Sequence, residues 1–143
     1  METIFHKDYE VARDDFAHAG TASSDIKHTL SALGFQSSVL RRIAVASYEA
    51  EINLLIHAWG GHIDLDVFQD GRVQLVFKDP GPGIPDIAKA MTPGYSTADQ
   101  KAREMGFGAG MGLPNMKNVS DSFDIQSSPK GTTITMSFAE VEK

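Results

Sequence analysis

The chain has 143 residues, of which 41% are hydrophobic and 22% charged, as is typical of one globular domain with its own core. A formal net charge of −6 argues against a protein that binds nucleic-acid backbones, which requires a basic stripe. The lack of cysteine excludes disulfides and thiolate sites, and no apolar stretch reaches the length of a membrane span. We therefore expect one cytoplasmic domain, residues 1–143, without a nucleic-acid or membrane partner.

The N-terminal part of the sequence predicts a strand and a helix. The strand covers Thr3–His6 and can extend towards Val11. Apolar residues at helical spacing predict an amphipathic helix over residues 25–33, with Ser23 or Ser24 as its N-cap. This helix either offers a partner surface or simply covers the sheet, and we prefer the second interpretation.

A longer helix is predicted from Val39 to Trp59, and it carries the first candidate site residues. Glu49, Asn53 and His57 are four residues apart, so they lie along one face on successive turns. Beside a polyphosphate, Asn53 can offer a neutral oxygen to Mg²⁺, and Glu49 can accept a proton from a water or hydroxyl. The simpler alternative is a solvated helix face, and His57 is the weakest of the three candidates.

A predicted hairpin leads into the next candidate site. Residues 63–67 and 73–77 alternate between apolar and polar side chains, as in strands with one buried face. Asp79 follows, with Gly81 and Gly83 in a proline-rich loop. An ionised carboxylate only accepts hydrogen bonds, so Asp79 would select a donor such as an exocyclic amine, while the glycines permit close approach to the backbone. Taken alone, this stretch is better explained as a surface turn, since proline and glycine are common in turns.

Residues 84–105 carry little regular pattern apart from a short helix predicted over residues 86–91. A region this long without regular structure in a small domain is usually functional, and we interpret it as a lid over a ligand. Lys101 and Arg103 lie in this lid, where they either close on a terminal phosphate or remain solvated. Arg103 is the preferred candidate because it is nearer to the glycines that follow.

Glycine then occupies every second position from Gly106 to Gly112, directly before a helix predicted over residues 113–119. Free backbone amides at a helix N-terminus form an anion site, although the sequence lacks the lysine of a Walker motif. The alternative is a flexible linker, but four alternating glycines that lead into a helix favour the anion site. Strands are predicted from Phe123 and over residues 132–138. Thr132 begins the last strand, where it could reach a base held by Asp79.

The order of these motifs resembles the Bergerat fold, the ATP-binding domain of gyrase-type ATPases, histidine kinases and mismatch-repair ATPases. The motifs are Glu49-x-x-x-Asn53, Asp79-x-Gly81-x-Gly83, Gly108-x-Gly110-x-Gly112 and Gly131-Thr132. Within that superfamily, the chain most resembles the small anti-sigma-factor serine/threonine kinases and related switch kinases of bacterial stress signalling. The segment Tyr9–Ser24 has no counterpart in that pattern.

The resemblance implies a role for each motif. Glu49 would be the catalytic base, Asn53 the Mg²⁺ ligand, Asp79 the acceptor for the adenine amine, and Thr132 a support of the adenine pocket. Phosphates would lie on the backbone amides of the glycine loop, which comprises Gly108, Ala109, Gly110, Met111, Gly112 and Leu113. The implied cofactors are ATP and Mg²⁺.

The fold we expect is a two-layer α/β sandwich, in which a mixed, mainly antiparallel sheet carries helices on one face and the lid covers the nucleotide. The leading functional hypothesis is a regulatory serine/threonine kinase that phosphorylates a small anti-anti-sigma-type protein. The alternative is a nucleotide-gated module that holds a sigma factor, phosphatase or other regulator with little or no catalysis. A homodimer suits the anti-sigma branch better than the switch branch.

Overall fold

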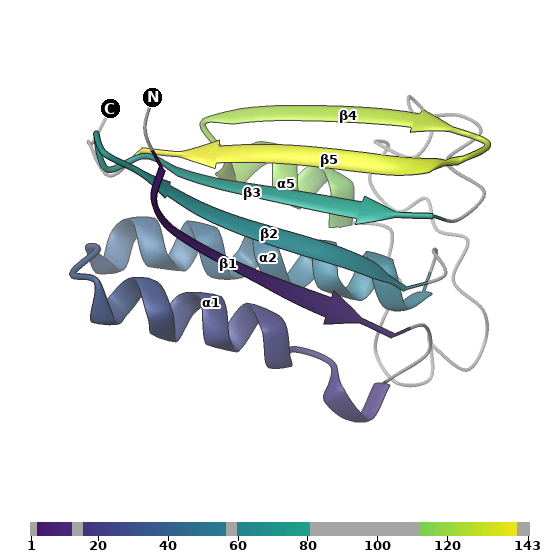
Figure 1. The fold of residues 1–143 in the computed structure, drawn as a ribbon, viewed down its shortest axis with the longest axis horizontal. Helices are drawn as coiled ribbons and strands as arrows, with labels where there is room; N and C mark the ends of the chain where they lie inside the picture. Colours follow the sequence, from purple (N-terminus) through teal and green to yellow (C-terminus); the bar gives the residue numbers. More distant parts are fainter. Residues whose placement is uncertain (1–2, 13–15, 57–59, 81–111, 140–143) are drawn as a thin grey trace.

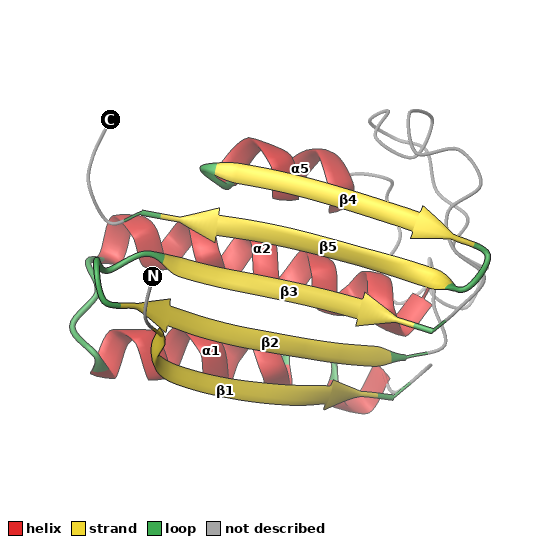
Figure 2. Ribbon diagram, turned by 45° about the horizontal axis from the view of Figure 1, so that its top comes forward, coloured by secondary structure: helices red, strands yellow, loops and turns green. Residues whose placement is uncertain are grey.

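The computed structural model describes residues 3–12, 16–56, 60–80 and 112–139. These residues form two layers, a five-stranded sheet and a layer of helices that covers one of its faces (Figure 1). The other face of the sheet carries no helix in this part of the chain, as Figure 2 shows. The two-layer α/β sandwich expected from the sequence is therefore confirmed.

The sheet has the strand order β1-β2-β3-β5-β4, so β1 and β4 are its edges. The strands are β1 (Thr3–Val11), β2 (Gly61–Phe68), β3 (Val73–Asp79), β4 (Ser122–Ser128) and β5 (Gly131–Phe138). All the pairings between them are antiparallel, so the described sheet lacks the parallel component of the mixed sheet that we expected. Antiparallel neighbours suit this chain because short hairpin turns join β2 to β3 and β4 to β5.

Alternation along the strands places one face of the sheet in the core. In β2, Ile63, Leu65 and Val67 are buried, while the residues between them are partly exposed. The central strands β3 and β5 follow the same rule, with Phe77 and Phe138 almost fully buried. The buried side chains face the helices, and the outer face of the sheet carries mostly polar residues, with Phe68 and Val76 as exceptions.

Helix α2 (Ser37–Ile56) lies between α1 (Thr21–Ala32) and α5 (Gly112–Val119) and packs against both. Its small and branched residues form the packing face predicted from the sequence, since Ile43, Ala46, Ala50 and Leu54 are all buried. A short 3-10 helix, η1 (Phe16–His18), precedes α1. His57 and Trp59, which the sequence assigned to α2, lie outside the described residues.

Helix α1 begins at Thr21 rather than Asp25, and neither Ser23 nor Ser24 is its N-cap. Gly20 occupies the N-cap position, with φ 89° and no side-chain hydrogen bond of its own. The carboxylate of Glu51 on α2 replaces the missing cap. It accepts backbone N–H groups of Gly20, Ala22 and Ser23 at 3.2, 3.2 and 3.0 Å. A side chain distant in sequence therefore fixes the start of α1.

Arg42 connects α2 to the C-terminal ends of α5 and β5. Its guanidinium donates to the backbone oxygens of Val119 and Ala139 at 3.0 and 3.1 Å. The same group lies 3.4 Å from Asp121 and stacks over the ring of Phe138. These contacts join α2 to the C-terminal ends of α5 and β5.

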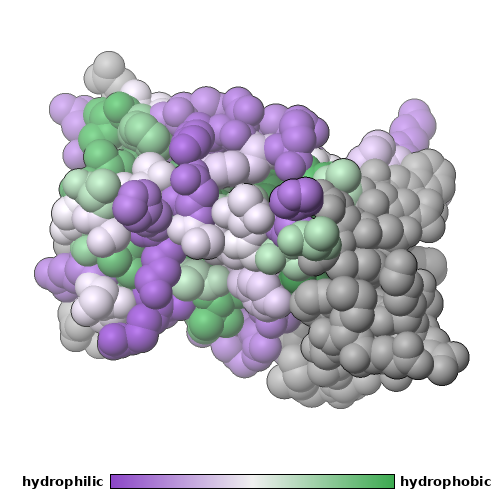
Figure 3. All heavy atoms as spheres, turned by 90° about the horizontal axis from the view of Figure 1, so that it is seen from below, coloured by the Kyte–Doolittle hydropathy of each residue, from purple (hydrophilic) through white to green (hydrophobic). Residues whose placement is uncertain are grey.

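The surface seen from below is largely hydrophilic, with separate hydrophobic patches between polar residues (Figure 3). Ile4, Leu33, Val45 and Tyr48 are the large hydrophobic side chains exposed in the described part of the chain. None of the described helices is both long and apolar enough to cross a membrane.

Candidate nucleotide-binding site

Asp79 and Thr132 face each other across two neighbouring strands. They are register partners at the C-terminal end of β3 and the N-terminal end of β5. By strand alternation both side chains lie on the helix-covered face, since Phe77 and Ile134 are buried two residues away. Thr132 is only 6% exposed, and its hydroxyl lies 2.8 Å from that of Ser127 on β4. The pairing of Asp79 with Thr132, which the adenine-site hypothesis requires, is therefore present.

Gly131 has a specific reason to be glycine at this end of the sheet. Its φ is 142°, a conformation that side chains disfavour, and a Cβ built on it would lie 2.1 Å from the backbone oxygen of Asp79. Only a residue without a side chain lets β5 begin this close to the end of β3. Gly131 thus sets the position of Thr132 relative to Asp79.

Glu49 and Asn53 lie one turn apart on the C-terminal half of α2, and both are partly buried. Burial raises the pKa of the Glu49 carboxyl above its usual range. A carboxylate with a raised pKa is a better proton acceptor near neutral pH than an exposed one. The neutral amide of Asn53 can supply an oxygen ligand to a hard cation such as Mg²⁺.

The elements that carry these residues converge at one end of the molecule. The C-terminal half of α2, the end of β3, the start of β5 and the N-terminus of α5 all point to the same side in Figures 1 and 2. Gly112 begins α5 and Leu113 is buried against the core. The remaining predicted residues lie outside the described ranges: Gly81, Gly83, Arg103, Gly108, Ala109, Gly110 and Met111. The predicted lid and its helix over residues 86–91 lie there as well.

Glu51 is the residue of this region that sequence reasoning missed. Its side chain is 2% exposed, although it lies between the two predicted site residues of α2. Its position could have been recognised from helical spacing. Glu51 is four residues from buried Ser47 and three from buried Leu54, so it lies on the core face of the helix. A charged residue in a core position usually has hydrogen-bond partners, and here they are the α1 amides.

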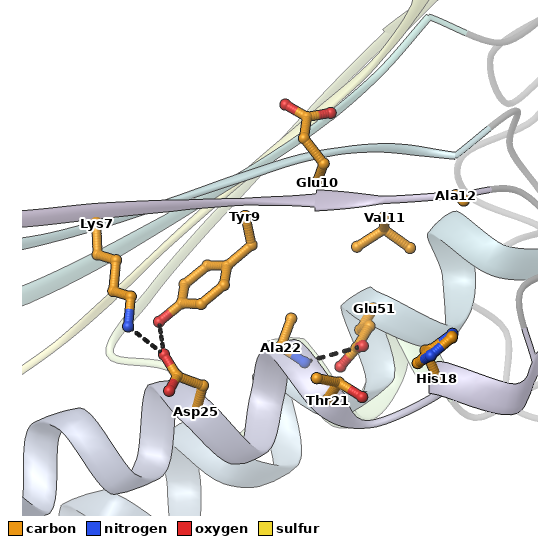
Figure 4. Close-up of a pocket in the computed structure, with 10 residues that line it drawn as sticks. All are labelled: Lys7, Tyr9, Glu10, Val11, Ala12, His18, Thr21, Ala22, Asp25 and Glu51. Carbon is orange, nitrogen blue, oxygen red and sulfur yellow. Dashed lines mark hydrogen bonds and ion pairs between the residues drawn. The ribbon is translucent and has the colours of Figure 1, made fainter.

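A cavity of about 480 Å³ lies between β1 and the N-terminal part of α1 (Figure 4). Lys7 and Tyr9 both converge on Asp25 at its edge, with distances of 2.7 and 2.6 Å to the same carboxylate oxygen. The Lys7 ammonium, followed by the Tyr9 hydroxyl, lowers the pKa of Asp25. Of the segment Tyr9–Ser24, unassigned from the sequence, the described residues 9–12, His18, Thr21 and Ala22 line this cavity, and Gly20, Ala22 and Ser23 belong to the capped start of α1.

Comparison with known proteins defines the class. Residues 12–138 match the model of the histidine kinase-like ATPase domain, and the chain belongs to that family. It is 36% identical over 106 residues to the serine/threonine-protein kinase RsbT of Bacillus subtilis, covering 71% of this chain and 74% of the relative. It is 34% identical over 110 residues to the anti-sigma F factor of Geobacillus stearothermophilus, covering 73% and 72%.

Two solved structures share the fold of this chain. A crystal structure of the RsbU and RsbW domains of a Mycobacterium tuberculosis protein matches with a TM-score of 0.63 and 17% identity, over 93% of this chain and 32% of that longer one. The structure of the SiaB-SiaC complex from Pseudomonas aeruginosa matches with a TM-score of 0.62 and 11% identity, over 95% and 89% of the two chains. At these identities the likeness concerns the fold alone.

Proposed function

We propose that this protein is an ATP-dependent serine/threonine kinase that regulates a partner protein by phosphorylating it. Membership of the ATPase family and the named relatives, a serine/threonine kinase and an anti-sigma factor, support this proposal. The observation that carries it furthest is Glu49, a partly buried carboxylate with a raised pKa on the helix that also bears Asn53. A protein that only bound nucleotide would need no proton acceptor there.

The side chains and backbone amides of the candidate site suit ATP and Mg²⁺. Asp79 offers an acceptor for the adenine amine on the same face as the buried Thr132, its register partner. Asn53 offers a neutral oxygen to Mg²⁺, and the first backbone amides of α5 can hold phosphate oxygens. The predicted glycine loop and Arg103 would complete the phosphate site.

Phosphoryl transfer needs positioning and charge stabilisation more than covalent catalysis by the protein. When bound, ATP supplies the phosphoryl group and Mg²⁺ neutralises part of its charge. In this proposal Glu49 accepts the proton of a serine or threonine hydroxyl on the partner, and Asp79 fixes the orientation of the nucleotide. The partner is expected to be a small anti-anti-sigma-type domain that presents this hydroxyl.

The alternative is a nucleotide-gated binding module, which the anti-sigma factors among the relatives favour. Such a protein would hold a sigma factor, a phosphatase or another regulator in one nucleotide state and release it in the other. Chemistry would then be slow or absent. The two proposals differ in what Glu49→Ala does, because a switch keeps its ATP-dependent partner binding and output whereas a kinase loses its output.

The test uses γ-labelled ATP and Mg²⁺ with lysate of the source organism. Wild type, Glu49→Ala and the control Asp124→Asn, an exposed carboxylate on β4, are compared side by side. The kinase proposal expects one small protein to be labelled by wild type and by the control but not by Glu49→Ala. If ATP binds and nothing is labelled, the binding module becomes the better proposal.

The role of Asn53 is tested separately through Mg²⁺. In Asn53→Ala, the affinity for ATP should lose its dependence on Mg²⁺ while affinity without the metal stays close to that of wild type. Calorimetric titration of ATP with and without Mg²⁺ measures both quantities. An unchanged Mg²⁺ dependence would refute the ligand role.

A further inference from the structure

The open face of the sheet carries a dense cluster of histidines and carboxylates where β1 pairs with β2. Consecutive register pairs on this face join a histidine to a carboxylate, a carboxylate to a carboxylate, and a carboxylate to a histidine. We refer to the six residues as the open-face cluster: His6 with Asp66, Asp8 with Asp64, and Glu10 with His62. Figure 4 shows Glu10 on the side of β1 opposite Tyr9 and Val11, pointing away from the helices.

Three potential ligand atoms converge at the centre of this cluster. His6 Nε2 lies 3.5 Å from Asp8 Oδ2 and 3.8 Å from Asp64 Oδ1. All three side chains can place their ligand atoms within 4.8 Å of one another, and no other group of this kind occurs among the described residues. Bonds of about 2.0–2.2 Å to a tetrahedral Zn²⁺ place ligand atoms roughly 3.3–3.6 Å apart. The two separations from His6 Nε2 are therefore close to the tetrahedral range, and the two carboxylate oxygens lie within 4.8 Å of each other.

The histidine is already oriented as a metal ligand would be. His6 Nδ1 lies 2.8 Å from Asp66 Oδ1. An ionised carboxylate only accepts hydrogen bonds, so without a metal each ring nitrogen donates to the carboxylates that it faces, Nδ1 to Asp66 and Nε2 to Asp8 or Asp64. A metal ion between Nε2 and those two carboxylates would take the place of the Nε2 proton and leave the Nδ1–H on Asp66. A carboxylate behind a histidine in this way fixes the tautomer and ring orientation of metal ligands.

The second histidine repeats the arrangement from the neighbouring strand. His62 Nδ1 is hydrogen-bonded to Glu10, and its Nε2 lies 3.1 Å from Asp64 Oδ1. Asp64 is thus approached by both imidazoles. His62 is placed beside the three central ligands, where it can stabilise Asp64 or become a further ligand.

The charge of the cluster also favours a cation. Asp8 and Asp64 are direct register partners, and like charges opposite each other destabilise a strand pair. Lys78 on β3 is the register partner of His62 and adds one positive charge at the edge of the cluster. The four carboxylates outnumber the positive charges that Lys78 and both histidines can provide, so the face remains negative in either protonation state of the histidines.

We propose that His6, Asp8 and Asp64 bind a divalent transition-metal ion of the Zn²⁺ type on the open face of the sheet, with water in the remaining position and Asp66 orienting His6. One ligand nitrogen and two carboxylate oxygens suit Zn²⁺ better than Mg²⁺, which rarely uses imidazole. Because the ligands come from β1 and β2, the ion would fasten the edge strand to the sheet. This site is independent of the proposed kinase activity.

The test titrates Zn²⁺ into full-length protein without ATP or Mg²⁺, by calorimetry, with Co²⁺ absorption as a second readout of imidazole and carboxylate ligation. Wild type is expected to bind one Zn²⁺ per chain, with no competition from excess Mg²⁺. Both His6→Gln and Asp64→Asn should weaken binding by at least tenfold, and Asp66→Asn by 10- to 100-fold, the usual cost of losing such a supporting carboxylate. Asp124→Asn, on the same open face but in β4, should bind as wild type does.

Circular dichroism in EDTA checks that every variant is folded before titration. Absence of Zn²⁺ binding by folded wild type would overturn the proposal and leave the cluster as a network of histidine–carboxylate pairs. Binding that His6→Gln and Asp64→Asn leave unchanged would overturn it equally, because the metal would then lie on other residues.

Discussion

Glu49 and Glu51 are two residues apart on α2, and their surroundings give the two carboxylates different roles. Glu51 is buried and satisfied by three backbone amides at the start of α1. Burial raises the pKa of Glu49, which lies beside the core face of the same helix. One carboxylate therefore stabilises the fold, whereas burial of the other disfavours its charged form.

Removal of the Glu51 carboxylate should destabilise the protein. In Glu51→Ala the amides at the start of α1 lose a charged acceptor in a buried place, and we expect a loss of about 3 kcal/mol in the free energy of unfolding. Urea denaturation measures the change. Arg41→Ala, exposed on the same helix, is the control and should stay within about 0.5 kcal/mol of wild type. Equal urea midpoints for Glu51→Ala and wild type would show that the cap contributes nothing.

The stability effect of Glu49 should depend on pH. Its pKa is raised in the folded state, so the folded protein binds more protons than the unfolded chain between the two pKa values. Wild-type stability therefore declines as pH rises through that window. Above the window, the full loss of stability caused by burying the ionised carboxylate is present. Glu49→Gln should be more stable than wild type at pH 7, with a difference that disappears as pH falls to about 4, near the pKa of an unfolded glutamate.

Unfolding free energies of the two proteins, measured between pH 4 and 8, provide the comparison. A lower stability of Glu49→Gln at pH 7, or a difference that does not change with pH, would contradict the assignment. Together with loss of transfer in Glu49→Ala, the expected result would indicate a residue kept for function at a cost in stability.

At the scale of elements, the sequence predicted most strands and helices because alternation and helical spacing are local signals. Residues 63–67 and 73–77 fall within β2 and β3 as predicted, and the glycine-led helix at residue 113 is α5, which begins at Gly112. The predicted start of α1 was wrong, because the residue that caps this helix, Glu51, comes from another helix. The open-face cluster was not predicted, since it depends on which residues of β1 and β2 are register partners. Local patterns contain no information about that register.

The junction of β3 and β5 should tolerate no side chain at Gly131. Alanine there would place Cβ 2.1 Å from the backbone oxygen of Asp79, so the two strand ends must separate. We expect Gly131→Ala to lower both stability and ATP affinity, the latter at least tenfold. Gly71→Ala is the matched control, because Gly71 also has a positive φ, 87°, but a Cβ there meets nothing within 4 Å.

Gly71→Ala should therefore lower the free energy of unfolding only by the backbone strain, about 1 kcal/mol, and leave ATP affinity unchanged. Thermal unfolding and calorimetric titration with ATP measure the two effects in both variants. Equal ATP affinities for Gly131→Ala and Gly71→Ala would mean that the Asp79–Thr132 pairing does not contribute to nucleotide binding.

At the scale of the whole molecule, the candidate site joins the helix layer to the sheet, so nucleotide binding should stabilise the entire domain. Glu49 and Asn53 come from α2, Asp79 from β3 and Thr132 from β5. A ligand that binds only the folded state at 100 times its Kd adds about 2.7 kcal/mol to the free energy of unfolding. ATP should raise the unfolding temperature accordingly, and its effect should depend on Asp79.

Asp79→Asn replaces the charged acceptor with an amide, which should weaken ATP binding by about 1–3 kcal/mol. For a loss of 2 kcal/mol, roughly 30-fold in affinity, the same ATP concentration would add only about 0.9 kcal/mol. Thermal unfolding of both proteins, with and without ATP, measures this difference. The variant without ATP is the control for any direct effect on the fold. If ATP stabilises Asp79→Asn as much as wild type, the adenine amine is held by another residue and the assignment of Asp79 is wrong.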